Sequence, residues 1–166
     1  MIVQKSVLTG MRQYLAVVML LLGIALGAPV WASGLDKLEA DAAAGDPWAQ
    51  LNLGAAYDHG IGIQADAEQA VYWYRMAAEQ GLEKAQFNLA HCLATGDGTV
   101  QDYLQARSWM HRAAEQGMPE AQFLLGAMLA EGLGGSVDKD AAKTWLQRAA
   151  DQGDADALAY LQRLSR

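Results

Sequence analysis

The sequence predicts an all-α protein in which pairs of antiparallel helices repeat along the chain. The first observation is a pattern of two alanines, an acidic residue, glutamine and glycine, which occurs at residues 77–81, 113–117 and 149–153. A weaker copy at residues 42–45 precedes them, and the four terminal glycines lie 36 residues apart. One constant period over most of a short chain is typical of a stacked repeat array. The second observation is that the chain has 17 glycines but only 3 prolines, which favours helices joined by short glycine turns.

Residues 1–32 differ from the rest of the chain and have the layout of a secretory signal peptide. Lys5 and Arg12 form a basic start, and an apolar run extends over residues 15–28. Val30 and Ala32 then lie three residues and one residue before a possible cleavage site at Ser33. This order of basic, apolar and small residues indicates export. We therefore expect the protein to be periplasmic or secreted.

Two alternatives remain open for this segment. An uncleaved membrane anchor is one, because residues 15–32 approach the length of about 18 residues that a membrane span needs. Glycines and a proline late in the run favour cleavage instead: Gly23, Gly27 and Pro29. Met11 is an alternative start, because Arg12 alone still supplies a basic end. In either case this segment is the only expected contact with a membrane.

The charge of the chain argues against two classes of partner. The net charge is −7, and removal of residues 1–32 would make it −9 because Lys5 and Arg12 are the only charged residues there. An acidic surface repels phosphate backbones, so we expect no nucleic-acid partner. It also disfavours electrostatic binding to an anionic membrane. Cys92 is the only cysteine in the sequence, which excludes an intramolecular disulfide.

The expected repeat array begins with a capping helix in residues 33–45. This segment matches only the second helix of a later repeat and ends at Gly45. Lys37 and Asp41 occupy positions that are Trp73 and Ala77 one period later. Polar residues suit a terminal unit, because its outer face has no neighbour to pack against.

The first full repeat, residues 46–81, contains signals for two helices and the turn between them. Asp46 followed by proline marks the start of the first helix. Gly60-Ile61-Gly62 ends that helix, and Asp66 with Gln69 forms a capping-box pattern for the second. Apolar residues recur at helical spacing in both helices: Ala49, Leu53, Tyr57, Ala70, Trp73 and Ala77. Gly81 then ends the second helix.

Residues 82–117 and 118–153 repeat these signals, and residues 154–166 form a last helix with no second helix after it. In the full repeats a small residue recurs where the two helices would approach each other closely: Gly54, Ala90 and Gly126. Gln162 takes this position in the last helix, where no partner helix requires a small residue. The chain is therefore expected to contain three full repeats between N- and C-terminal capping helices, about the minimum for a stable array.

The 36-residue unit resembles the Sel-like repeat (SLR) family, a relative of the tetratricopeptide repeats. The resemblance covers residues 45–164 and rests on the small-residue-Leu-Gly helix, the Gly-x-Gly turn, the capping aspartate and the Ala-x-x-Trp helix. It implies an α-solenoid, a right-handed superhelix of helix pairs that serves as an interaction scaffold, and bacterial members are often exported adaptors of the envelope, of signalling or of host contact. One exported branch carries a cysteine pair in each repeat. Those pairs are missing here, so the affinity of that branch for β-lactam-like ligands is not transferred.

The sequence contains no pattern that predicts a catalytic, cofactor or metal site. The three Gly-x-Gly turns lack the preceding strand and the following lysine of a phosphate-binding loop. His59, His91 and His111 have no partner at metal-ligand spacing. No Ser-His-Asp order or paired-carboxylate spacing stands out. We therefore expect a protein that is not an enzyme and has no cofactor.

A stripe on the first helix of each repeat is the candidate partner-binding surface. By analogy with tetratricopeptide arrays, positions i, i+3, i+7 and i+10 of these helices line a concave groove. The candidates are Trp48, Leu51, Asp58, Lys84, Phe87, His91, Glu120 and Phe123. Leu51, Phe87 and Phe123 fit equally well as core residues. Packing does not require the residue types of Trp48, Lys84, His91 and Glu120, which makes these four the better candidates.

The sequence thus predicts a monomeric, non-enzymatic scaffold or adaptor of the bacterial envelope that binds a protein or peptide. One alternative is an envelope enzyme or ligand-binding protein that acts on peptidoglycan or β-lactam-like compounds. A second alternative is a structural subunit of an envelope complex, held by its convex face or its ends.

Overall fold

A computed structural model describes residues 30–164 of the chain, with side chains described from Gly34 onward. The secondary structure of these residues is entirely α-helical, which confirms the all-α class. The predicted signal segment lies outside the described residues, except that Val30 to Ala32 belong to the first described helix. None of the described helices is long and apolar enough to cross a membrane.

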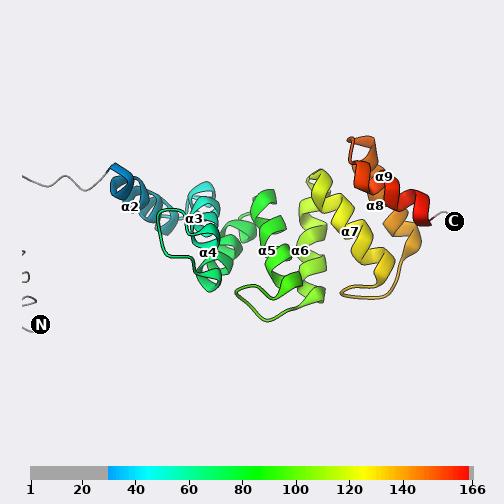
Figure 1. Ribbon diagram of the computed structural model, residues 1–166, viewed down its shortest axis with the longest axis horizontal. Helices are drawn as coiled ribbons and strands as arrows, with labels where there is room; N and C mark the ends of the chain where they lie inside the picture. The colour runs from blue at the N-terminus through cyan, green and yellow to red at the C-terminus, as the bar shows by residue number, and fades with distance from the viewer. Residues whose placement is uncertain (1–29, 165–166) are drawn as a thin grey trace, which may run out of the picture. The chain divides into compact units, whose positions relative to one another are not determined.

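The described helices form three antiparallel pairs between two unpaired helices (Figure 1). We call the first helix of each pair helix A and the second helix B. The helices A are α3 (Pro47–His59), α5 (Glu83–Thr95) and α7 (Pro119–Glu131), and the helices B are α4 (Ala67–Glu79), α6 (Tyr103–Glu115) and α8 (Lys139–Asp151). By its position in the period, α2 (Val30–Ala43) is a helix B and α9 (Ala155–Leu164) is a helix A. From α3 to α9, each helix packs against the next in the chain.

The aspartate caps form as the sequence predicts. Asp46 Oδ1 accepts a hydrogen bond from the amide of Ala49 at 2.7 Å, which closes the start of α3. At the start of α6, Asp102 Oδ1 accepts from the amide of Gln105 at 2.9 Å. Gln105 Nε2 also donates to Asp102 Oδ2 at 2.8 Å. Hydrogen bonds from the amide and side chain of Gln105 hold the pKa of the Asp102 carboxyl below its usual value.

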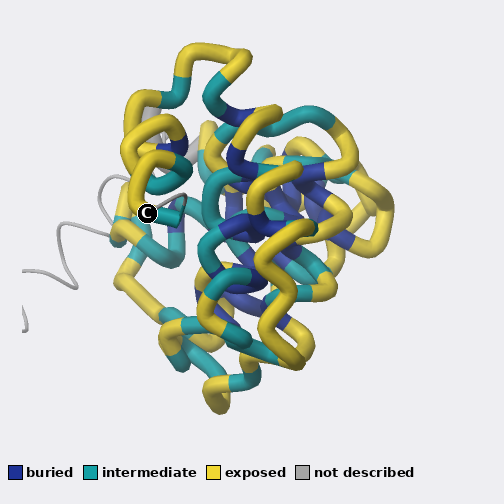
Figure 2. Tube along the Cα trace, turned by 90° about the vertical axis from the view of Figure 1, so that its right-hand side faces the viewer, coloured by how far each residue is buried: buried dark blue, intermediate teal, exposed yellow. Residues whose placement is uncertain are grey.

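Small residues allow helix A and helix B of one repeat to approach closely. A Cβ added to Gly54 would lie 2.7 Å from Cδ1 of Tyr74 on α4. At the same position in the third repeat, a Cβ on Gly126 would lie 2.6 Å from Cγ of Leu146 on α8. The predicted role of these small residues is therefore confirmed. The buried positions, dark blue in Figure 2, gather inside the array where the helices face one another, and the exposed positions surround them.

In the second and third repeats, the second glycine of the Gly-x-Gly turn packs the repeat onto the one before it. Gly98 has a φ of 66° and Gly134 a φ of 73°, a backbone conformation that favours glycine. A Cβ on Gly98 would overlap the carbonyl group of Ala67 at the start of α4, and one on Gly134 would overlap that of Tyr103 at the start of α6. These turns therefore serve stacking.

A buried glutamine links three segments at each repeat boundary. In the second repeat, Gln86 Nε2 donates to the carbonyl oxygen of Ala78 at 3.3 Å. Gln86 Oε1 accepts from Gln116 Nε2 at 2.8 Å, and Gln116 Nε2 also donates to the carbonyl oxygen of Gly81 at 2.8 Å. The end of the preceding helix B, helix A and the end of its own helix B are thus joined. The same arrangement recurs with Ala42, Gly45, Gln50 and Gln80, and with Ala114, Gly117, Gln122 and Gln152.

Candidate functional site

Four of the predicted stripe residues have exposed side chains on the helices A. Trp48 on α3 is 55% exposed, the largest side chain among the exposed apolar residues. Lys84 and His91 on α5 and Glu120 on α7 are also exposed. Trp48, Lys84 and Glu120 occupy the same position in three consecutive repeats. These are the four residues whose types packing does not require.

The other apolar stripe residues contribute to packing. Leu51 is only 7% exposed and belongs to the main hydrophobic core. Phe87 is half-buried against that core. Phe123 is also half-buried, and its ring meets that of Tyr160 on α9 edge to face with the centroids 6.3 Å apart. Leu51 therefore offers little surface to a partner, whereas the two phenylalanines keep part of their rings accessible.

Asp58, the remaining stripe residue, is held by a tyrosine that the sequence did not single out. The hydroxyl of Tyr74 donates to Asp58 Oδ2 at 3.2 Å, and Tyr74 is only 1% exposed. Burial raises the pKa of Tyr74, and the negative charge of Asp58 raises it further. The pair occurs in the first repeat alone, since Met110 and Leu146 replace the tyrosine in the other two. The signal in the sequence that could have revealed this pair is a tyrosine at a position that carries methionine or leucine in the other two repeats.

The lone cysteine lies in an apolar environment. Cys92 on α5 is buried, and its thiol is free. Burial is the main reason that the pKa of this thiol is raised to about 11, and the negative charges of Asp58 and Asp97 add to the effect. A thiol with so high a pKa is a poor nucleophile near neutral pH. Within the described residues, no group of three or more His, Cys, Asp or Glu side chains is arranged to hold a metal ion.

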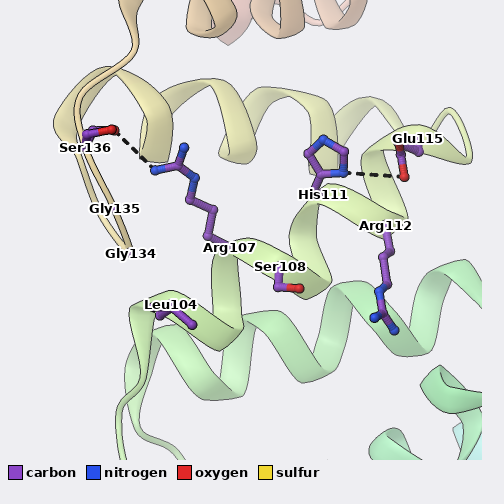
Figure 3. Close-up of a pocket in the computed structure, with 9 residues that line it drawn as sticks. All are labelled: Leu104, Arg107, Ser108, His111, Arg112, Glu115, Gly134, Gly135 and Ser136. Atoms are coloured by element: carbon purple, nitrogen blue, oxygen red, sulfur yellow. Dashed lines mark hydrogen bonds and ion pairs between the residues drawn. The ribbon is translucent and has the colours of Figure 1, made fainter.

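Two shallow hollows lie on the helices B, away from the predicted stripe. The larger, about 610 Å³, is bounded by α6 and by the turn before α8 (Figure 3). It is lined by Leu104, Arg107, Ser108, His111, Arg112, Glu115, Gly134, Gly135 and Ser136. The second, about 580 Å³, is lined by Lys143, Thr144, Gln147, Arg148 and Leu161. Sequence analysis missed both hollows, because each depends on how a neighbouring segment folds over a helix B.

The tryptophans of the helices B lie half-buried at the margin of the core. Arg112 stacks over the ring of Trp109, and Arg148 over that of Trp145, each at 4.4 Å from the ring centroid. The Trp145 ring also meets His111 of the preceding helix B, with centroids 5.4 Å apart. These rings therefore contribute to packing between successive repeats and keep one side for arginine contacts.

Antiparallel helix pairs stacked in register, with glycine turns that abut the preceding repeat, define an α-solenoid repeat protein. The family model of the Sel1 repeat matches residues 49–82, 83–118 and 119–154, so the chain belongs to the Sel1 repeat family. Proteins of this family are generally protein-interaction scaffolds and typically non-enzymatic. Among curated proteins, no match to the chain was found.

Solved structures of Sel1-type proteins are similar to this chain. A Sel1 repeat protein from Oxalobacter formigenes is 39% identical with a TM-score of 0.72, and the match covers 78% of this chain and 98% of that one. The protein c5321, described as a protective antigen of uropathogenic Escherichia coli strains with an SLR fold, is 36% identical with a TM-score of 0.75. That match covers 76% of this chain but 27% of c5321. Cysteine rich protein B of Helicobacter pylori, at 16% identity and a TM-score of 0.62 over 81% of this chain and 99% of that one, supports the fold alone.

Proposed function

We propose that this protein is a non-enzymatic adaptor of the bacterial envelope that binds a protein or peptide across the exposed stripe of its helices A. The observation that carries the proposal is the exposure of Trp48, Lys84, His91 and Glu120 on three consecutive helices A. The assignment to the envelope rests on the signal-peptide layout of residues 1–32.

The residue types on the stripe suit recognition of a protein surface. A tryptophan at the centre of an interface is among the side chains that contribute most to binding free energy. Trp48 supplies such an anchor, and nothing in the core requires it to be a tryptophan. Lys84 and Glu120 present opposite charges one repeat apart, which favours one orientation of a partner over its reverse. The glutamine links and glycine turns keep these helices in fixed register, so little entropy is lost on binding.

Capture of partners from a periplasmic extract tests the stripe. The test variant combines Trp48→Ala, Lys84→Ala and Glu120→Ala. The matched control combines Tyr72→Ala, Lys143→Ala and Asp140→Ala, which removes an exposed aromatic, a lysine and an acid from the helices B. Circular dichroism verifies that both variants are folded. We expect the test variant alone to lose partners that the wild type captures, and equal recovery by all three proteins would contradict the stripe.

Two further measurements test the rest of the proposal. N-terminal sequencing of the protein purified from its native host should begin at or near Ser33. An intact N-terminus in the membrane fraction would instead support the uncleaved anchor. Incubation with peptidoglycan and with a chromogenic β-lactam should yield no turnover, and robust turnover of either compound would contradict a non-enzymatic adaptor.

A further inference from the structure

The hollow on α6 combines three residues that differ from their counterparts in the other repeats. We call it the Arg107 hollow; its polar and apolar groups nearest the turn are Leu104, Arg107, Ser108, His111, Gly135 and Ser136, and Arg112, Glu115 and Gly134 complete its lining. It lies on helix B, so it is separate from the stripe on the helices A. Residues that depart from the repeat pattern are not explained by stacking, which is the same at every boundary.

The first departure is Arg107 itself. The equivalent position is Val71 in the first repeat and Lys143 in the third. Arg107 is half-buried, and its Nη1 donates to the carbonyl oxygen of Ser136 at 3.3 Å. Among the described residues, no carboxylate forms an ion pair with Arg107. The same holds for every other described lysine and arginine except Lys37, so the absence of an ion pair does not by itself distinguish Arg107.

The second departure is the loss of an acidic residue next to Arg107. Leu104 occupies a position that is Glu68 in the first repeat and Asp140 in the third. An acid at this position would lie one helical turn before Arg107, at the i, i+3 spacing that favours an ion pair. Leu104 is instead 70% exposed. The second repeat has thus replaced a neutralising charge with accessible apolar surface.

The third departure gives the guanidinium group its space. Gly135 replaces Ile63 and Thr99 of the other turns, and a Cβ at this position would lie 2.6 Å from Nη1 of Arg107. The neighbouring Gly134 abuts the backbone of Tyr103, so the turn is fixed over α6. A side chain at residue 135 would therefore displace the arginine.

Figure 3 shows how the polar groups of the Arg107 hollow are directed. Arg107 extends from α6 toward the turn that carries Ser136, His111 extends on the same side of the helix, and Arg112 points the other way. His111 Nδ1 lies 3.4 Å from Glu115 Oε2, which leaves its second ring nitrogen available. Arginine presents five N–H donors in a fork that matches a carboxylate, and the hydrogen bond to Ser136 occupies only one of them.

We propose that the Arg107 hollow binds a carboxylate of an acidic peptide segment, with an apolar side chain of the same segment resting on Leu104. Arg107 is the anchor, and the hydroxyl of Ser108 is a further donor on the same helix face. A single arginine beside an exposed leucine matches one carboxylate next to an apolar residue. A polyanion such as nucleic acid fits poorly, because the net charge of −7 repels an extended row of phosphates.

The test is a titration followed by NMR, with the Arg107 side-chain Nε–H and the Gly135 amide as reporters. The probe is a short peptide with one aspartate next to a leucine, blocked at both ends, and the matched peptide replaces the aspartate with asparagine. Arg107→Gln removes the positive charge. Leu104→Glu introduces an acidic side chain, as the first and third repeats have at this position, and it should not disturb the fold because Leu104 is exposed. Lys143→Gln is the control at the equivalent position of the third repeat.

We expect the aspartate peptide to shift both reporters in the wild type and in Lys143→Gln. Loss of a charge-assisted hydrogen bond should weaken binding by about tenfold in Arg107→Gln, and Leu104→Glu should weaken it comparably. Equal binding of the aspartate and asparagine peptides would contradict carboxylate recognition. Unchanged affinity in Arg107→Gln would contradict the anchor, and inorganic phosphate that binds as tightly as the peptide would contradict a peptide ligand. These results leave the proposed stripe untouched, because none of these variants alters a helix A.

Discussion

The boundaries between repeats and the outward faces of the helices follow opposite rules. At each boundary the same residue types make the same contacts, as the buried glutamines Gln50, Gln86 and Gln122 show. On the outward faces, equivalent positions differ: Trp48, Lys84 and Glu120 share one exposed position, and Glu68, Leu104 and Asp140 share another. Stacking needs one solution repeated, whereas recognition needs a surface that is not periodic. In this chain the positions that vary between repeats are therefore the ones that point to function.

The second glycine of the Gly-x-Gly turns shows the same contrast between a position that contacts another repeat and one that does not. Gly134 and Gly62 both have a φ of 73°. A Cβ on Gly134 would overlap the backbone of Tyr103, whereas one on Gly62 would have nothing within 4 Å. The backbone conformation is thus shared, and only the close approach to another repeat differs.

The largest effect is expected from Gly134→Ala. The alanine must adopt a left-handed conformation and must also push the turn away from α6, so we expect a loss of about 3–4 kcal/mol in the free energy of unfolding. Gly62→Ala suffers the conformational strain alone and should lose about 1 kcal/mol. Urea unfolding followed by circular dichroism measures both values. Equal losses in the two variants would mean that the turn of the third repeat does not pack against α6 in solution.

The next effect concerns the glutamine links. Gln86→Leu keeps the approximate volume but removes two hydrogen bonds, one to the carbonyl of Ala78 and one from the side-chain amide of Gln116. Each of these groups keeps another partner, so the expected loss is the net contribution of two hydrogen bonds, about 2 kcal/mol. Gln64→Leu, at an exposed position, should change the free energy of unfolding by less than about 0.5 kcal/mol. A Gln86→Leu variant as stable as the wild type would show that the link contributes nothing.

A smaller effect is expected where an outward-facing residue is tied to the interior. Tyr74→Phe removes the hydrogen bond to Asp58, which stays partly accessible to water, so the loss should be about 1 kcal/mol at neutral pH. The pKa of Tyr74 is raised in the folded protein above its ordinary value of 10.0, so folding favours the neutral phenol. Its stabilisation is complete below pH 10.0 and is lost as the pH rises above that value.

The pH dependence of the free energy of unfolding distinguishes Tyr74 from the other groups that lose a proton at alkaline pH. The pKa of Cys92 is also raised, to about 11, so its contribution to the free energy of unfolding is likewise lost at alkaline pH. The Tyr74→Phe variant should therefore retain part of the alkaline decrease in stability. We expect the stability of the variant to fall less steeply above pH 10.0 than that of the wild type. Identical slopes in urea titrations across this range would show that the Tyr74 hydroxyl is not held against Asp58.

The sequence predicted the features that depend on neighbours in the chain. The aspartate caps act within three residues, and a small residue recurs at one place in the helix A of each repeat (Gly54, Ala90 and Gly126), so both were recognised. The glutamine links were missed, because Gln86 bonds to Ala78 and Gln116, and Gln116 in turn to Gly81, through bonds that join different helices. In the pattern of apolar and polar residues along a helix, glutamine is also normally expected at the surface. Its recurrence at residues 50, 86 and 122 was the signal that could have revealed its burial.

The surface was predictable only in part, for a related physical reason. Residue type indicated that Trp48, Lys84, His91 and Glu120 are exposed, since none of them suits a packed position. Whether Leu51 or Phe123 is buried depends on the helix that follows, and Phe123 meets Tyr160 from the last helix. The Arg107 hollow depends on a turn that folds over α6, and the residue of that turn that bonds to Arg107 lies 29 residues further along the chain. Periodicity alone gives no information on such a contact.

The smallest effect on stability should accompany the largest effect on binding. Lys84→Ala and Glu120→Ala remove exposed side chains that form no hydrogen bond or ion pair within the described part of the chain, so each should change the free energy of unfolding by less than about 0.5 kcal/mol. If the stripe is the recognition surface, the same two changes weaken capture of the partner, while Gln86→Leu weakens capture only as far as it unfolds the protein. Thermal unfolding and partner capture, measured on the same preparations, separate these outcomes. A loss of stability in Lys84→Ala as large as that in Gln86→Leu would mean that this outward face serves stacking as well, and the division between boundary and surface would fail there.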